Sequence, residues 1–114
     1  MPEQARSARL LAVMAGIAFL LPLQALAVGE ASLVIRNHRF EPAELTVPAG
    51  TKIKLKVRNA DSTAEEFESY DLHREKVVPA GTEAVIYVGP LEPGSYAFFG
   101  DFNQKTAQGK LIAK

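Results

Sequence analysis

The chain has 114 residues, with 13 basic and 13 acidic side chains, so its formal net charge is zero. This length allows one small domain, and the balanced charge argues against nucleic-acid binding, which requires clustered excess Lys and Arg. The sequence contains no cysteine, which excludes disulfides, thiolate nucleophiles, thiolate zinc sites and blue copper centres with a Cys ligand.

Residues 1–27 have the pattern of a secretory signal peptide. Arg6 and Arg9 precede an apolar run over residues 10–21, and small residues at the A-x-A positions predict cleavage at the end of the segment. The apolar run is short for a membrane span, although an uncleaved N-terminal anchor is the alternative. We therefore expect a soluble periplasmic protein, at most peripheral to the membrane, whose domain covers residues 28–114.

Short strands separated by Pro and Gly turns follow the signal segment. The clearest strand covers residues 51–58, where Ile53, Leu55 and Val57 alternate with basic side chains, as expected for one buried and one wet face. An irregular connection is expected over residues 37–42. Further strands are expected at residues 32–36, 45–47, around Phe67, 82–88, 96–99 and 110–113.

The number and spacing of these strands predict the fold class. About seven to eight short strands with regular turns, and no helical periodicity after residue 27, indicate an antiparallel Greek-key β-sandwich or barrel. Both faces of residues 82–88 are apolar, which favours a central position for that strand. The aromatic residues Tyr96, Phe98, Phe99 and Phe102 are expected to pack in the core.

An acidic run, AEEFESYDLHREKVV, covers residues 64–78. In an extended strand Phe67 would face the core, and Glu66 and Glu68 would share the other face, roughly 7 Å apart at the backbone. Carboxylates suit hard ions, and a mixed set of carboxylates and imidazoles suits Fe or Cu(II). The pair is therefore a candidate metal site, and the alternative is a solvated strand face.

The same run contains a second alternating set, Asp71, His73 and Glu75. In an extended segment these side chains would share a face and offer a ligand strip, whereas a bend just before Asp71 would direct the two acidic sets to different points. Arg74 and Lys76 offer a competing explanation, because they can pair with the carboxylates in surface ion pairs. Such pairs stabilise a protein by only about 0–1 kcal/mol each.

Several motifs in chain order resemble the cupredoxin family. They are Phe40-Glu41-Pro42, Leu45-x-Val47-Pro48-x-Gly50, a strand that ends at Asn59, and Pro93-Gly94-x-Tyr96-x-Phe98. The resemblance covers nearly all of residues 28–114. It implies a periplasmic Greek-key sandwich, which in most members holds copper through two His, one Cys and an axial Met.

The sequence departs from this family at every copper ligand. Glu65-Glu66-Phe67 stands where the family places its first His, and Gly100 stands at the Cys position. Asn103 lies near the second His, and Thr106 or Ala107 lies at the Met. A blue, electron-transferring copper site is therefore excluded on chemical grounds.

The acidic run is similar to that of the EfeO-type cupredoxin-like proteins. The similarity lies in Glu66-Phe67-Glu68-Ser69 and in Asp71-Leu72-x-Arg74-Glu75-Lys76-Val77. It implies a component of a bacterial ferrous-iron uptake system, with ferrous-iron permease system proteins as partners. It further implies that the chain binds an iron or copper ion and assists the oxidation of ferrous iron before transport.

The resemblance adds two candidate ligands, His38 and Asp101, at the end of the sandwich where cupredoxins carry their ligand loops. A lone surface histidine is the alternative for His38. The complete set of candidate metal ligands is Glu66, Glu68, Asp71, Glu75, His38, His73 and Asp101. Two other functions stay open: a metal-free interaction module of the same uptake complex, and a periplasmic Cu(II) carrier that depends on the two histidines.

Overall fold

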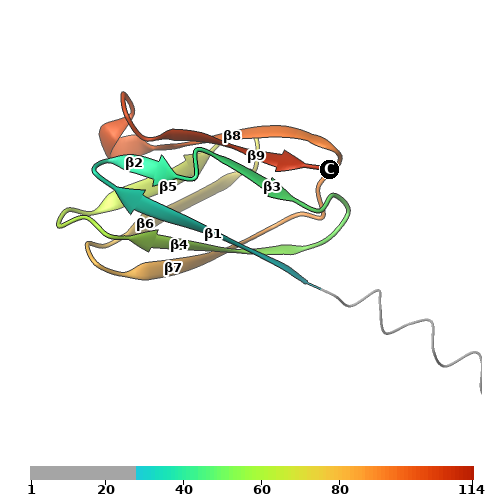
Figure 1. Cartoon of the computed structure of the whole chain (residues 1–114), viewed down its shortest axis with the longest axis horizontal. Helices are drawn as coiled ribbons and strands as arrows, with labels where there is room; N and C mark the ends of the chain where they lie inside the picture. The colour runs from blue at the N-terminus through green and yellow to red at the C-terminus, as the bar shows by residue number, and fades with distance from the viewer. Residues whose placement is uncertain (1–27) are drawn as a thin grey trace, which may run out of the picture.

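The computed structural model describes residues 28–114, so the expected signal peptide lies outside the described residues. Nine strands in this range form two sheets that pack face to face (Figure 1). The strands are β1 (Gly29–Arg36), β2 (Arg39–Glu41), β3 (Glu44–Val47), β4 (Ile53–Asn59), β5 (Glu65–Ser69), β6 (Arg74–Val78), β7 (Glu83–Val88), β8 (Gly94–Gly100) and β9 (Gln108–Ala113). The expected β-sandwich is therefore confirmed, with one strand more than predicted.

The first sheet has the strand order β2-β1-β4-β7, and the second has the order β3-β9-β8-β5-β6. Most neighbours are antiparallel, but β1 pairs with β4 in parallel and β3 pairs with β9 in parallel. The β-sandwich is as predicted, but the expected antiparallel pairing was wrong at these two pairs. After β2 the chain crosses to the second sheet as β3 and then returns to the first sheet as β4. Because no hairpin joins β1 to β4, these two neighbours can run in parallel.

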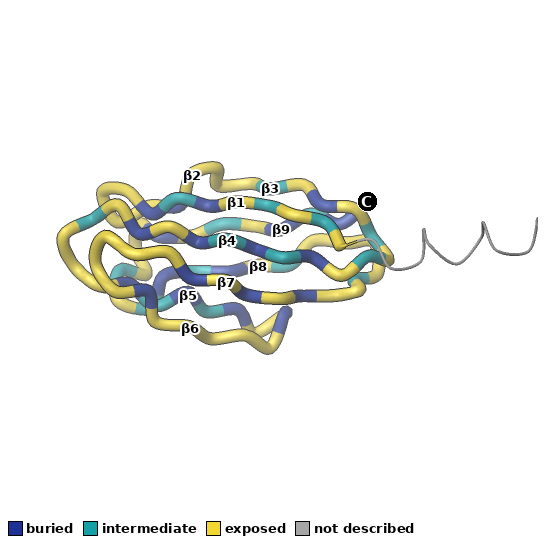
Figure 2. The backbone as a smooth tube through the Cα atoms, turned by 90° about the horizontal axis from the view of Figure 1, so that it is seen from below, coloured by how far each residue is buried: buried dark blue, intermediate teal, exposed yellow. Residues whose placement is uncertain are grey.

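The core lies between the sheets, and burial follows the period of two residues most clearly along β4, β5 and β7 (Figure 2). Ile53, Leu55 and Val57 on β4 are each fully buried, as their alternation with basic residues predicts. Phe67 and Phe98 stack with ring centroids 5.3 Å apart. Phe98 and Phe40 meet edge to face, with ring centroids 4.9 Å apart. These aromatic contacts fix β5 and β8 side by side, which matters for the candidate site below.

Strand β7 lies at the edge of its sheet, so its predicted central position was wrong. Its second apolar face is exposed to solvent, with Val85 at 41% and Tyr87 at 46% exposure. The Lys52 ammonium lies 4.9 Å from the centroid of the Tyr87 ring, a cation–π contact that explains an aromatic residue at this exposed position. Apolar residues on both faces of β7 therefore do not mean that both faces are buried.

The aromatic cluster expected in the core is only partly buried. Phe98 is buried and Tyr96 packs against the core from its edge, but Phe99 is half-buried on the outer face and Phe102 is 53% exposed. Phe99 follows Phe98 on the same strand, so their side chains must point to opposite faces.

Asn59 and Asp61 hold the connection between β4 and β5. The fully buried Asn59 amide donates to the carbonyls of Thr63 and Val78, and its side-chain oxygen accepts from the Asp61 N–H. The Asp61 carboxylate accepts the N–H groups of Asn37 and His38, which both have positive φ in the tight turn before β2. The segment expected to be irregular therefore contains a strand and an anchored turn. Among the described residues, no helix has the length and apolar character needed to cross a membrane.

Candidate metal centre

Strand β5 alternates as its sequence predicts. Glu65, Phe67 and Ser69 are buried, while Glu66 and Glu68 lie half-buried on the outer face of the second sheet. The two outward carboxylates therefore share a face, and the buried Phe67 between them prevents a shift of register by one residue.

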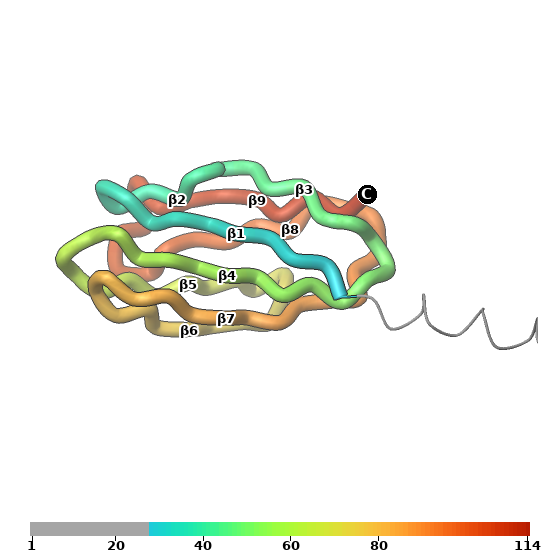
Figure 3. The backbone as a smooth tube through the Cα atoms, turned by 60° about the horizontal axis from the view of Figure 1, so that its bottom comes forward, coloured from blue at the N-terminus to red at the C-terminus, as the bar shows by residue number. Residues whose placement is uncertain are grey.

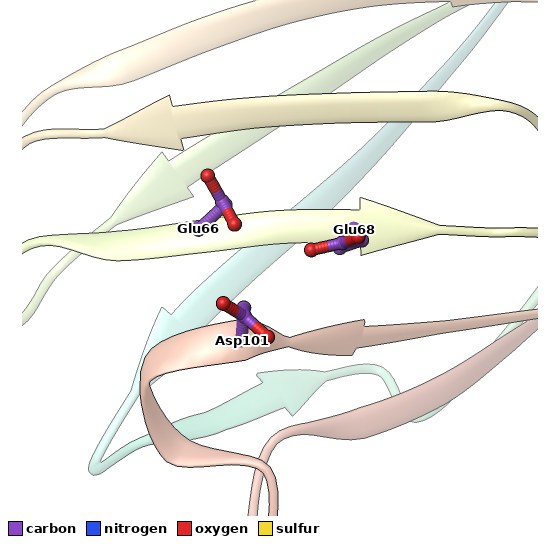
Figure 4. A group of neighbouring side chains, drawn as sticks. All are labelled: Glu66, Glu68 and Asp101. Carbon is purple, nitrogen blue, oxygen red and sulfur yellow. The ribbon is translucent and has the colours of Figure 1, made fainter.

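A third carboxylate joins this pair from the turn that follows β8. Asp101 begins the 3-10 turn Asp101–Asn103, directly after β8. One oxygen from each of Glu66, Glu68 and Asp101 lies within 4.8 Å of the other two (Figure 4). The predicted residue Asp101 thus lies with the predicted pair, across the boundary between β5 and β8.

The charges of these side chains repel one another. Partial burial raises the pKa of Glu66, and the negative charges of Glu75, Glu68 and Asp101 raise it further. No ion pair within residues 28–114 involves any of these carboxylates. The group therefore carries an uncompensated negative charge that a cation would relieve.

Arg74 does not neutralise the acidic group, although its position in sequence favoured an ion pair. Its guanidinium donates instead to the carbonyls of Leu72, His73 and Tyr87. The guanidinium thus ties the turn between β5 and β6 to β7, and the carboxylates on the outer face remain free of it.

The geometry is compatible with a hard cation. An ion that binds three oxygens at about 2.1 Å holds them roughly 3 Å apart, a spacing comparable with oxygens that already lie within 4.8 Å of one another. Half-buried glutamates on a strand can make the remaining adjustment without backbone movement. The protein would supply an open set of oxygen ligands on one side of the ion, and the other side would face solvent.

Asp71 and His73 lie outside this group. They belong to the turn between β5 and β6, at the other end of β5 from the Asp101 turn (Figure 3). The Asp71 carboxylate accepts the N–H of Ala97, and His73 adopts a positive φ of 55°. A bend before Asp71 therefore separates the two acidic sets.

Glu75 and His38 are also outside the group of three. Glu75 lies opposite Glu68 in the β5–β6 register, where its charge acts on Glu66. His38 lies in the turn before β2, and its Nδ1 is 3.6 Å from the Asp61 carboxylate. Neither histidine contributes to the carboxylate group.

The sequence reasoning missed the role of Glu65, which is only 1% exposed. Its Oε1 accepts the N–H groups of Glu66 and Phe102, and its Oε2 accepts an N–H of the Asn103 amide at 2.7 Å. These bonds attach the Asp101–Asn103 turn to β5. The alternation itself contained the signal, because a residue two before the buried Phe67 must also point inward.

The residues that the family resemblance matches to the copper ligands lie around the Glu65 carboxylate. A Cβ atom at Gly100 would lie 2.6 Å from the Glu65 Cδ and 2.7 Å from the Ala107 Cβ, and Asn103 donates to the same carboxylate. The residues matched to the copper ligands thus converge in space. They offer no thiolate or imidazole, and the carboxylate fills the space, so they do not fit a type 1 copper ion.

The model of the cupredoxin-like domain family matches residues 9–113. The chain belongs to this family. A relative, uncharacterized protein RP394 of Rickettsia prowazekii (strain Madrid E), is 52% identical over 83 residues, which cover 73% of this chain and 66% of that protein. The chain thus spans slightly less than two thirds of this relative.

Solved structures of copper proteins share the fold of this cupredoxin-like chain. Auracyanin A, a blue copper protein from Chloroflexus aurantiacus, superposes with a TM-score of 0.67 at 12% identity, over 77% of this chain and all of that one. The metal-binding domain of the Cu(I)-exporting ATPase CopA from Streptococcus pneumoniae D39 has a TM-score of 0.64 at 16% identity, with 76% and 86% covered. At these identities the likeness establishes the fold alone.

Proposed function

We propose that this protein is a periplasmic metal-binding component of a ferrous-iron uptake system and that Glu66, Glu68 and Asp101 hold the ion. The observation that carries the proposal is the convergence of these three carboxylates from β5 and from the turn after β8, with no ion pair to neutralise them within the described part of the chain. The similarity of the acidic run to EfeO-type proteins supports the assignment to iron uptake, and the N-terminal pattern supports export.

The ligand set favours iron over copper. Three carboxylates match the charge of Fe³⁺, which is a harder ion than Fe²⁺ and prefers oxygen ligands. Cu(II) carriage would favour imidazole ligands, and neither His38 nor His73 belongs to the carboxylate group. The residues that the family resemblance matches to the copper ligands lie around the Glu65 carboxylate and offer no thiolate or imidazole, which argues against copper binding there within the described residues.

Preference for the harder ion would assist oxidation. Stronger binding of Fe³⁺ than of Fe²⁺ lowers the reduction potential of the bound ion, and the electron would pass to a one-electron acceptor on a partner protein. Ferrous-iron permease system proteins would then receive the ion. The chain would act by capture and by selective binding, without a redox cofactor of its own.

Calorimetry tests this proposal directly. Fe²⁺ under anaerobic conditions, Fe³⁺ as its citrate complex and Cu²⁺ are titrated into the purified protein and into the Glu66→Gln/Glu68→Gln variant. We expect micromolar or tighter iron binding that weakens by at least about tenfold in the variant, which corresponds to about 1.4 kcal/mol.

A matched variant controls for the loss of charge. Glu83→Gln/Glu92→Gln removes the same charge from exposed positions elsewhere on the domain, and it should bind iron as the wild type does. Equal iron binding by both variants, or no binding by the wild type, would overturn the proposal. The second of these results would favour the metal-free interaction module, and a preference for Cu²⁺ would favour the copper carrier.

A further inference from the structure

An open groove of about 560 Å³ lies on the outer face of the second sheet. Its walls are largely apolar, with Ala43, Tyr70, Ala97 and Phe99 among the lining residues. The rings of Tyr70 and Phe99 meet edge to face, with centroids 5.4 Å apart, and Tyr70 is 72% exposed. An exposed tyrosine beside a half-buried phenylalanine suits a protein-binding surface, where aromatic residues are enriched.

The groove adjoins the acidic group. Phe99 lies opposite Glu68 in the β5–β8 register. Tyr70 also lines a second open hollow of about 470 Å³, together with Glu68, His73 and Glu75. The aromatic pair therefore stands between an apolar groove and a set of carboxylates, on one continuous face.

The charges on this face have an uneven distribution. Within the groove, Lys110 lies opposite Glu44 in the β3–β9 register, so that pair of charges is balanced. On the other side of the aromatic pair, Glu66, Glu68 and Asp101 have no ion-pair partner in the described range. A ligand that covers both regions must be apolar at one end and positively charged at the other.

We propose that this face docks a segment of a partner protein in which Lys or Arg residues flank an aliphatic or aromatic residue. The apolar side chain would enter the groove against Tyr70 and Phe99, and the cationic side chains would lie over the carboxylates. Arg suits this role best because its guanidinium binds carboxylates in a bidentate manner and stacks on aromatic rings. The docking requires only the negative charge of the carboxylates. It therefore does not depend on the proposal that they bind a metal.

The two proposals are nevertheless linked. A metal ion on the carboxylates would reduce the negative charge that attracts the partner, so each ligand should weaken the other by the same factor. Release of the ion would then strengthen docking, and docking would favour release of the ion towards the partner.

Selection from a displayed random-peptide library tests the docking surface. The library is selected on the wild-type protein, and the enriched peptides are then measured against variants. We expect peptides with net positive charge that carry an apolar residue beside Lys or Arg. Their affinity should fall at least about tenfold in Tyr70→Ser, a change at a side chain exposed enough to leave the fold intact.

Val85→Ser/Tyr87→Ser is the matched control, because it removes exposed apolar side chains from the opposite sheet. This control should bind the peptides as the wild type does. Added salt should weaken binding, and an iron ion should compete only if the carboxylates bind iron. A failure of iron binding alone therefore leaves this proposal standing.

Three results would overturn the proposal. They are enrichment of neutral or acidic peptides, equal affinity for Tyr70→Ser and the wild type, and no enrichment at all. A dimer that dissociates in Tyr70→Ser, measured by sedimentation, would overturn it by identifying the occupant as a second copy of the chain.

Discussion

Replacement of Glu65 tests whether a buried carboxylate holds the candidate site together. Glu65 is 1% exposed and accepts hydrogen bonds from the Glu66 and Phe102 N–H groups and from the Asn103 amide. Glu65→Ala removes the acceptor and leaves partly buried donors without partners on β5 and on the turn that carries Asp101. Glu65→Gln keeps the shape and one acceptor oxygen, and Asn103 can turn its own oxygen towards the new amide.

The structure sets the size of both effects. Each hydrogen bond to a charged group contributes about 1.5–3 kcal/mol, and an unsatisfied buried donor costs about 1–3 kcal/mol. Because these terms overlap, we expect Glu65→Ala to lower the free energy of unfolding by about 3–5 kcal/mol and Glu65→Gln by about 1 kcal/mol. A domain of this size has a total stability of only about 4–13 kcal/mol, so the alanine variant should be close to unfolding.

Urea unfolding followed by circular dichroism measures these losses, with Glu83→Ala at an exposed position as the control. The same series in thermal unfolding should show a fall in Tm of at least about 12 °C for Glu65→Ala. A loss below about 1 kcal/mol for Glu65→Ala, or equal losses for the alanine and glutamine variants, would refute the hydrogen-bond argument.

Three further predictions concern charge and the copper position. The raised pKa of Glu66 means that this residue binds more protons in the native state than in the unfolded state, so its contribution to the free energy of unfolding should fall as pH rises through the carboxyl range. Because Asp61 acts in the opposite direction, the measurement is the difference between the wild type and Glu66→Gln in urea unfolding, which should fall as pH rises; a difference that stays constant with pH would contradict this. Backbone hydrogen bonds from the turn before β2 lower the pKa of Asp61, so Asp61→Ala should cost about 1–3 kcal/mol at neutral pH, and the cost should shrink as pH falls through the folded-state pKa. A constant cost across pH would argue against this. Glu65→His/Gly100→Cys/Asn103→His/Ala107→Gly should produce the intense visible absorption of a Cu(II)–thiolate site, whereas Gly100→Cys alone should not, since Glu65 and Ala107 occupy that space; a folded but colourless fourfold variant would show that these residues do not form the copper position.

Much of the fold followed from local patterns. The alternation of Ile53, Leu55 and Val57 with basic residues predicted a half-buried strand, and the structure confirms it. The same rule oriented β5 around Phe67, so Glu66 and Glu68 were expected on a common face. Such predictions succeed because the side-chain period of a strand depends on the backbone alone.

Other features depended on distant parts of the chain. Nothing local indicated that β7 would lie at a sheet edge with Tyr87 exposed, because strand order depends on which neighbours cover each strand. The meeting of Asp101 with Glu66 and Glu68 depends on the pairing of β5 with β8, and the family resemblance suggested Asp101 only in outline.

The sequence by itself determined the class of fold, the period of each strand, the absence of sulfur ligands after residue 27 and the candidate carboxylates. Only the tertiary structure decided which candidates come together. It separated Asp71 and His73 from the group, because the β5–β6 turn directs them away, and it placed the Glu65 carboxylate among Gly100, Asn103 and Ala107. Which side chains can bind one ion depends on the distances between strands. Those distances follow from strand pairing, which the packing of the whole core determines.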